Sequence, residues 1–106
     1  MKKKIERILK EIKRYLKERY GEKIRKVILY GSYARGEATE DSDVDVMVVI
    51  SDDLNTRDVE RYIDPFVADI LLEKKELVSV IVVKESVYEN EESDIIMNVH
   101  REGVVV

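Results

Sequence analysis

The chain has 106 residues, of which 44% are hydrophobic and 40% are charged, and its formal net charge is -4. A chain of this length has room for one hydrophobic core, so we expect a single domain over residues 1–106. Its longest apolar run, Val46 to Ile50, is far shorter than the roughly 20 residues that a membrane-spanning helix needs. Charged residues also interrupt the segment after the basic N-terminus, so no signal peptide is expected. We therefore expect a cytoplasmic protein that contacts no membrane.

Composition also restricts the chemistry. The net negative charge argues against direct nucleic-acid binding, which depends on lysine and arginine neutralising phosphates. Because the chain has no cysteine, it has no disulfide, thiolate metal site or cysteine nucleophile. A metal ion would need oxygen ligands or the single histidine, His100, which we expect instead to act as a cation near the end of the last helix. The basic outer face of the first helix is most simply a solvated surface with ion pairs.

Helical periodicity is clear in two long segments. Apolar residues at steps of three and four predict an amphipathic helix over residues 3–19, with Gly21 ending it. A second periodic segment contains Pro65, which would break an uninterrupted helix, and Asp64 precedes it as an N-cap would. We therefore expect a short helix, a bend, and a second helix from Pro65 to about Lys75.

The remaining elements are shorter. Apolar runs and alternating patterns predict three strands: Lys26–Tyr30, Val44–Ser51 and Leu77–Val83. One helical turn is expected over residues 86–90, and a last helix runs from Ser93–Asp94 to about Glu102. Gly103 ends that helix before a Val104–Val106 tail. Together these elements indicate an α+β fold with a small mixed sheet backed by helices.

A glycine and a serine follow the first predicted strand. Gly31 lets the backbone turn tightly and approach a ligand, while Ser32, at the start of the next helix, adds a hydroxyl to exposed N–H groups. This arrangement is typical of a phosphate-binding turn, although Gly-Ser alone is also a common structural turn. The second predicted strand carries Asp43 and Asp45, whose α-carbons lie about 6.7 Å apart on one face. Such a pair invites Mg²⁺, or it is a polar loop running into a strand with Asp45 facing solvent.

The two halves together resemble a known signature. The segment is similar to that of the minimal nucleotidyltransferases in the DNA polymerase β superfamily, which reads Gly-Ser-x-Ala-Arg-Gly and, after a loop, Ser-Asp-x-Asp-x-x-Val. The positions that match it are Gly31, Ser32, Ala34, Arg35, Gly36, Ser42, Asp43, Asp45 and Val48. The closing segment from Asn98 to Val104 also resembles that of the family, so the resemblance covers nearly the whole chain.

The resemblance implies roles for individual residues. Gly31 and Ser32 would bind the triphosphate of a nucleotide, ATP by expectation, and Asp43 and Asp45 would hold the Mg²⁺ ions that neutralise it. The same two aspartates would thus be the catalytic residues. Arg35 would contact phosphate, or it would form an ion pair within the motif.

One position departs from the family pattern. Active members carry a third carboxylate on the next core strand, where this chain has Ser79. That ligand mainly serves the metal that activates the attacking hydroxyl, so nucleotide binding could persist while catalysis is weak. Glu76 is out of phase with Ser79, and Glu85 lies about 20 Å further along the strand. Neither of them replaces the missing carboxylate.

The resemblance also implies a partner, because larger relatives attach a helical domain that completes the acceptor site. A minimal domain would borrow that surface from a copy of itself or from a HEPN-type helical protein, as in two-gene toxin–antitoxin systems. The first hypothesis is therefore a Mg²⁺-dependent enzyme that transfers AMP from ATP to a hydroxyl of a protein or small molecule. The alternative is a weakly active or inactive nucleotide-binding antitoxin module. An unrelated small domain with a chance acidic turn is the third possibility.

Overall fold

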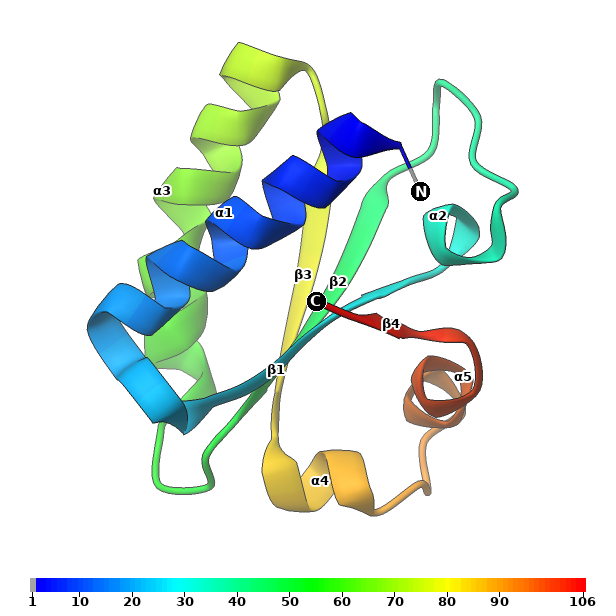
Figure 1. The fold of residues 1–106 in the computed structure, drawn as a ribbon. Helices are drawn as coiled ribbons and strands as arrows, with labels where there is room; N and C mark the ends of the chain where they lie inside the picture. The colour runs from blue at the N-terminus through cyan, green and yellow to red at the C-terminus, as the bar shows by residue number, and fades with distance from the viewer. Residues whose placement is uncertain (1) are drawn as a thin grey trace.

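The computed structural model describes residues 2–106 and contains, within them, a sheet of four strands in the order β3-β2-β1-β4 (Figure 1). The strands are β1 (Ile24–Tyr30), β2 (Val44–Ile50), β3 (Val78–Lys84) and β4 (Val104–Val105). β1 pairs antiparallel with β2 and with β4, whereas β2 and β3 are parallel. The predicted mixed sheet is therefore confirmed.

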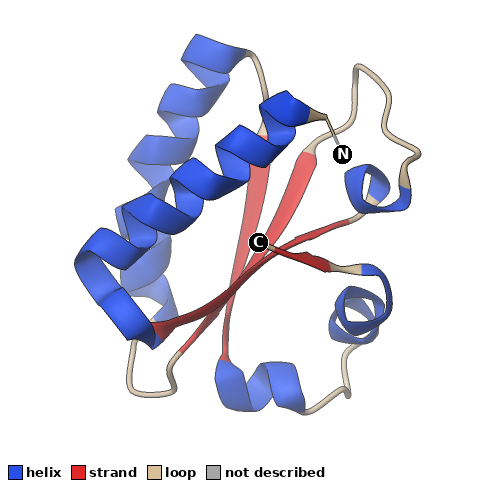
Figure 2. Cartoon of the chain, in the orientation of Figure 1, coloured by secondary structure: helices blue, strands red, loops and turns tan. Residues whose placement is uncertain are grey.

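Helices cover both faces of this sheet (Figure 2). They are α1 (Lys3–Tyr20), α2 (Ser32–Arg35), α3 (Thr56–Lys74), α4 (Glu85–Glu89) and α5 (Asp94–Glu102). Alternate β2 residues face opposite ways: Val46 and Val48 join the cluster under α1 and α3, while Met47 and Val49 join the one that contains residues of α4 and α5. Because both faces are covered, the strand reads as a continuous apolar run.

The first helix anchors the larger cluster. Its apolar stripe, comprising Ile5, Ile8, Leu9, Ile12 and Leu16, is at most 1% exposed. Each such side chain contributes roughly 1.5–3 kcal/mol on burial. Gly21 follows the helix with a φ of 56°, which only glycine adopts at little cost, and a 3₁₀ turn over Gly21–Lys23 leads into β1. The predicted helix and its glycine stop are both confirmed.

The predicted break at Pro65 is wrong, because α3 runs through it without interruption. Pro65 lies on the exposed side of the helix, so the carbonyl that loses its N–H partner can be hydrated. Val59, Ile63 and Ile70 are buried on the opposite side, before and after the proline. Their packing against the sheet outweighs the local cost of the proline.

The N-cap of α3 is Asn55 rather than Asp64. The Asn55 side-chain oxygen accepts hydrogen bonds from the backbone N–H groups of Arg57 and Asp58, at 2.9 and 3.2 Å. Asp64 lies inside the helix on its exposed side. The helix α3 therefore begins directly after the loop that precedes Thr56, and not at Pro65.

The tail after the last helix is a short strand. Val104 and Val105 pair with Leu29 and Ile28 of β1, and the Val106 N–H donates to the Val27 carbonyl at 2.9 Å. The chain thus closes on the strand that leads to Gly31. Among residues 2–106, no helix combines the length and apolar character needed to cross a membrane.

We predict that Asn55→Ala lowers the free energy of unfolding by about 1 kcal/mol, because two N–H groups of the first turn lose their acceptor. Asp64→Ala is the matched control and should change it by less than about 0.5 kcal/mol, since a residue inside a continuous helix caps nothing. Urea unfolding followed by circular dichroism measures both. A larger loss for Asp64→Ala than for Asn55→Ala would contradict the uninterrupted α3.

Candidate active site

Gly31 lies directly against the Asp45 carboxylate. It ends β1 with a φ of 76° and a ψ of -155°, a conformation almost confined to glycine. A Cβ atom at this position would overlap the Asp45 carboxylate and would lie 3.2 Å from its Cγ. The two halves of the sequence motif are therefore adjacent in space, and Ser32 begins α2 beside them. The N–H groups of a first helical turn have no acceptor within the helix, so they remain available to an anion.

Strand pairing fixes the position of Asp45. It lies opposite Tyr30 on β1 and beside Ser79 on β3. Asp43 precedes β2 in the same alternation phase and is exposed, whereas Asp45 is half-buried. Burial raises the pKa of Asp45 above its usual value, the Asp43 carboxylate raises it further, and Arg35 partly opposes both effects. An ionised Asp45 therefore needs a cation that the protein only partly provides.

The position expected for a third carboxylate is occupied by Ser79, as the parallel β2–β3 register shows. Within residues 2–106, no group of three His, Cys, Asp or Glu side chains is arranged to hold a metal ion. Glu76 pairs with Lys4 at 3.3 Å, and Glu85 pairs with Arg25 at 3.6 Å. Asp43, Asp45 and the Gly31 turn are thus the predicted site residues that lie close together.

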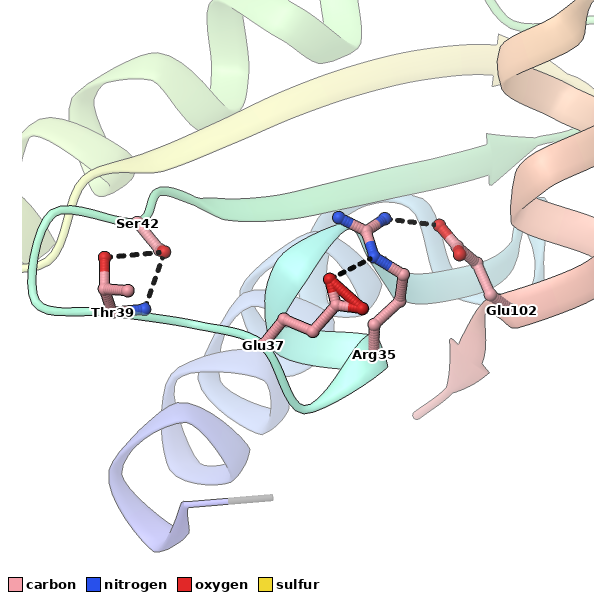
Figure 3. A network of polar contacts seen from close by, with 5 residues as sticks. All are labelled: Arg35, Glu37, Thr39, Ser42 and Glu102. Carbon is pink, nitrogen blue, oxygen red and sulfur yellow. Dashed lines mark hydrogen bonds and ion pairs between the residues drawn. The ribbon is translucent and has the colours of Figure 1, made fainter.

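Arg35 bridges two segments that are far apart in sequence (Figure 3). Its Nη1 lies 3.0 Å from Glu102 Oε1 on α5, and its Nε lies 3.4 Å from Glu37 Oε2. The sequence predicts either a phosphate contact or an ion pair within the motif for Arg35, and the structure shows the ion pair with Glu37. Its charge also acts on Asp45, so a phosphate bound beside Asp45 would lie within its electrostatic influence.

Ser42 organises the loop that leads to Asp43. Its hydroxyl accepts a hydrogen bond from the Thr39 N–H at 2.9 Å and lies 3.4 Å from the Thr39 hydroxyl (Figure 3). The Ser42 N–H donates to the Thr39 carbonyl at 3.1 Å. The motif pattern marked Ser42 without assigning it a role. Its hydrogen bonds with Thr39 hold the turn that leads directly into Asp43.

Three further residues clarify the surroundings. Tyr30 was not predicted as part of the site, yet it lies opposite Asp45 in the β1–β2 pair, and burial and the charge of Asp45 both raise its pKa. Its place directly before Gly31 is the sequence signal for this position.

Tyr33 is half-buried and packs against the cluster under α1 and α3. His100 stacks on Tyr88 with ring centroids 4.1 Å apart, and its Nε2 lies 2.7 Å from the Tyr88 carbonyl oxygen, so it ties α5 to α4.

Comparison with known proteins agrees with this geometry. The model of the nucleotidyltransferase domain matches residues 9–106. The chain belongs to the nucleotidyltransferase domain family. Protein adenylyltransferase MntA of Thermococcus cleftensis is 54% identical over 44 residues, which are 42% of each chain. A candidate protein adenylyltransferase of Methanocaldococcus jannaschii is 37% identical over 76 residues, or 70% of this chain and 72% of that protein.

A solved structure shows the same fold. The crystal structure of a toxin–antitoxin with AMP-PNP aligns with a TM-score of 0.58 and 18% identity, covering 90% of this chain and 69% of that one. The match to MntA spans less than half of that protein, and so does the match to another candidate protein adenylyltransferase of Methanocaldococcus jannaschii, at 44%. The predicted family and fold are thus confirmed. The roles of the individual site residues stay predictions.

We predict that Gly31→Ala abolishes Mg²⁺–ATP binding, because the added methyl displaces the Asp45 carboxylate. The expected loss in unfolding free energy is about 1–3 kcal/mol. Gly36→Ala is the matched control: Gly36 also has a positive φ, 74°, but nothing lies within 4 Å of its added Cβ. It should cost about 1 kcal/mol and leave binding intact. Calorimetric titration measures binding, and equal losses in both variants would contradict the role of the close approach.

We also predict that Asp45→Asn raises the melting temperature of the metal-free protein at pH 7. Because the folded state raises the pKa of Asp45, the ionised carboxylate destabilises the fold above its unfolded pKa. Protonation relieves this cost, so the difference between variant and wild type should shrink as the pH falls through the pKa of Asp45. Scanning calorimetry at pH 7 and pH 4 tests both points. Asp41→Asn, in the exposed loop, is the control, and a lower melting temperature for Asp45→Asn would show that the carboxylate is not strained.

Proposed function

We propose that this protein binds the Mg²⁺ complex of ATP and transfers AMP to a hydroxyl group of a protein, as the antitoxin of a toxin–antitoxin pair. The observation that carries this proposal is the Gly31 backbone held against Asp45, with Ser32 and Asp43 beside it. Family membership supports the reaction class. The names of its relatives, a protein adenylyltransferase and a toxin–antitoxin with AMP-PNP, support the nucleotide, the protein acceptor and the partner.

The donor set fits Mg²⁺, which prefers carboxylate oxygens and is usually held by one or two carboxylates together with substrate phosphates. Asp43 and Asp45 would hold the ion, and the glycine at position 31 leaves room for the Asp45 carboxylate, which a Cβ atom there would overlap. When bound, the metal neutralises the polyphosphate and stabilises the charge that develops in transfer. Ser32 would donate hydrogen bonds to a phosphate oxygen through its N–H and hydroxyl.

The reaction requires little covalent chemistry from the protein. The acceptor oxygen forms a bond to the α-phosphorus while the bond to pyrophosphate breaks, and the proton of the hydroxyl passes to solvent. Gly31, Ser32 and the two aspartates hold the triphosphate in a fixed orientation, which is where such sites gain most of their rate. Arg35 would stabilise phosphate charge if it exchanged Glu37 or Glu102 for the ligand. The acceptor hydroxyl comes from the partner, for which we propose a helical HEPN-type protein.

A second candidate function follows from Ser79. Its register beside Asp45 means that no protein carboxylate occupies the third ligand position. In this alternative the domain binds Mg²⁺–ATP, transfers AMP slowly or not at all, and acts by covering its partner.

We predict that α-labelled ATP with Mg²⁺ labels a HEPN-type protein from the same genome in the presence of this protein. Asp43→Ala and Asp45→Ala should abolish labelling, because each removes half of the carboxylate pair. Asp41→Asn is the control and should label normally. Calorimetric ATP binding without any labelling would favour the second candidate, and the absence of both binding and labelling would overturn the proposal.

Restoring the missing ligand separates the two candidates further. We predict that Ser79→Asp accelerates labelling by at least about tenfold, because a third carboxylate then lies in register with Asp45. Ser93→Asp, at the N-cap of α5, where the serine side chain forms no capping hydrogen bond, is the matched control for added charge. A Ser79→Asp variant that binds ATP but transfers no faster would show that Ser79 is not what limits turnover.

A further inference from the structure

A groove lies between α1 and the edge strand β4, and one of its walls is basic. Two adjoining cavities of about 520 and 360 Å³ share Lys10 and Val106. The larger is lined by Lys10, Lys13, Arg14, Lys17, Glu18 and Val106. Because residues three or four apart share a helix face, the cations form a continuous wall. This local excess of positive charge belongs to a chain whose net charge is -4.

The floor and far wall of the groove are apolar. Val104 and Val105 are 37% and 58% exposed, and with Val106 and Leu9 they form the apolar part of the smaller cavity, which Glu6 and Lys10 also line. Lys13 and Lys17 are half-buried, as expected when the aliphatic part of a lysine lies along an apolar surface and its amine reaches solvent. An occupant of the groove would therefore meet hydrocarbon on one side and positive charge on the other.

The backbone of β4 presents an open hydrogen-bonding edge. β4 is the last strand of the sheet, and among residues 2–106 no segment pairs with its outer side (Figure 1). The Val106 N–H points inward, toward the Val27 carbonyl. Because successive residues of a strand direct their backbone groups to opposite sides, the N–H and carbonyl of Val105 point outward. An extended peptide could pair with them as an added strand.

Part of the positive charge in the groove has no paired anion, although Glu6 and Glu18 also line the two cavities. Lys10 pairs with Glu6 at 3.2 Å, and Lys13 donates to the Val106 carbonyl at 2.7 Å. Within residues 2–106, neither Arg14 nor Lys17 has a side-chain hydrogen bond or ion pair. An acidic occupant would therefore gain ion pairs without breaking existing ones.

The groove discriminates between three kinds of occupant. A second copy placed by a two-fold axis would bring the same cations against each other. Single-stranded nucleic acid would be expected to stack on aromatic side chains, and none lines either cavity. A protein segment that alternates acidic and apolar residues fits these features. On the α1 side of an added strand the acidic residues would meet Arg14 and Lys17, and on the other side the apolar residues would lie beside Val105, which pairs with Ile28 of the opposite cluster.

We propose that the α1–β4 groove is a docking site for an extended acidic segment of a partner protein. The segment adds a strand outside β4, pairs with the Val105 backbone, and directs its carboxylates to Arg14 and Lys17. This site is separate from the carboxylate pair, so the proposal stands whether or not the protein transfers nucleotides.

The test uses a fluorescence-anisotropy screen of eight-residue peptides that alternate Glu or Asp with Val, Ile or Leu. A library in which Lys replaces the acidic residues is the control. We expect binding from the acidic library alone, weakened by rising salt. Arg14→Glu combined with Lys17→Glu should weaken it at least tenfold. The matched variant Arg57→Glu combined with Arg61→Glu, on exposed positions of α3, should leave it unchanged.

A second arm tests the strand pairing itself. The N–H groups of an extended peptide form two alternating sets, and only one set faces β4. In the best binder, methylating the amides of that set should abolish binding, whereas methylating the other set should leave it unchanged. Oligouridine that binds more tightly than every peptide and is lost in the Arg14/Lys17 variant would overturn the proposal in favour of nucleic acid. A dimer seen in sedimentation that dissociates in the same variant would also overturn the proposal. Equal binding by the acidic and lysine libraries, or no binding by either library, would do so too.

Discussion

The approach of the Gly31 backbone to the Asp45 carboxylate is the contact on which the rest of the site depends. It joins a turn and an acidic strand that are separated in the sequence by ten residues, which include most of α2. The β1–β2 register creates it by placing Tyr30 opposite Asp45. A register shift of one residue would turn Asp45 to the α1–α3 face, so the hydrophobic core that fixes the register also positions the chemistry. The two clusters on either side of β2 therefore serve the site as well as the fold.

The site also shows why a functional carboxylate opposes stability. Asp45 loses part of its hydration and lies near Asp43, and Arg35 compensates only in part, since two glutamates share its charge. Such tension is typical of sites that gain a cation with their ligand. Because Ser79 lies beside Asp45, no third negative charge from that position adds to this repulsion. In the proposed function the same serine leaves the metal ion with one protein ligand fewer, so lower strain and slower transfer would have one cause.

The sequence predicted those features that depend on local periodicity. The helix over residues 3–19 and the strand carrying Asp45 follow from strong patterns, and the place of Ser79 beside Asp45 follows from the family signature. The helix break predicted at Pro65 is wrong because the proline destabilises only its own turn. The burial of Val59, Ile63 and Ile70 against the sheet outweighs that cost, and this tertiary packing is not visible in the local sequence. The Arg35–Glu102 pair joins positions too far apart for any local pattern. β4 is too short to have a period, and only its pairing with β1 makes it a strand.

The ion pair between Arg35 and Glu102 has a consequence for communication across the molecule. Glu102 is the last residue of α5, and one residue separates it from β4. A phosphate that draws Arg35 away would leave Glu102 without its counter-ion and loosen the junction from which β4 begins. Nucleotide binding at one end of β1 would thus alter the affinity of the α1–β4 groove for a peptide. By thermodynamic reciprocity, a peptide bound in that groove would change the affinity for nucleotide by the same factor. Two remote sites would then be linked through a single guanidinium.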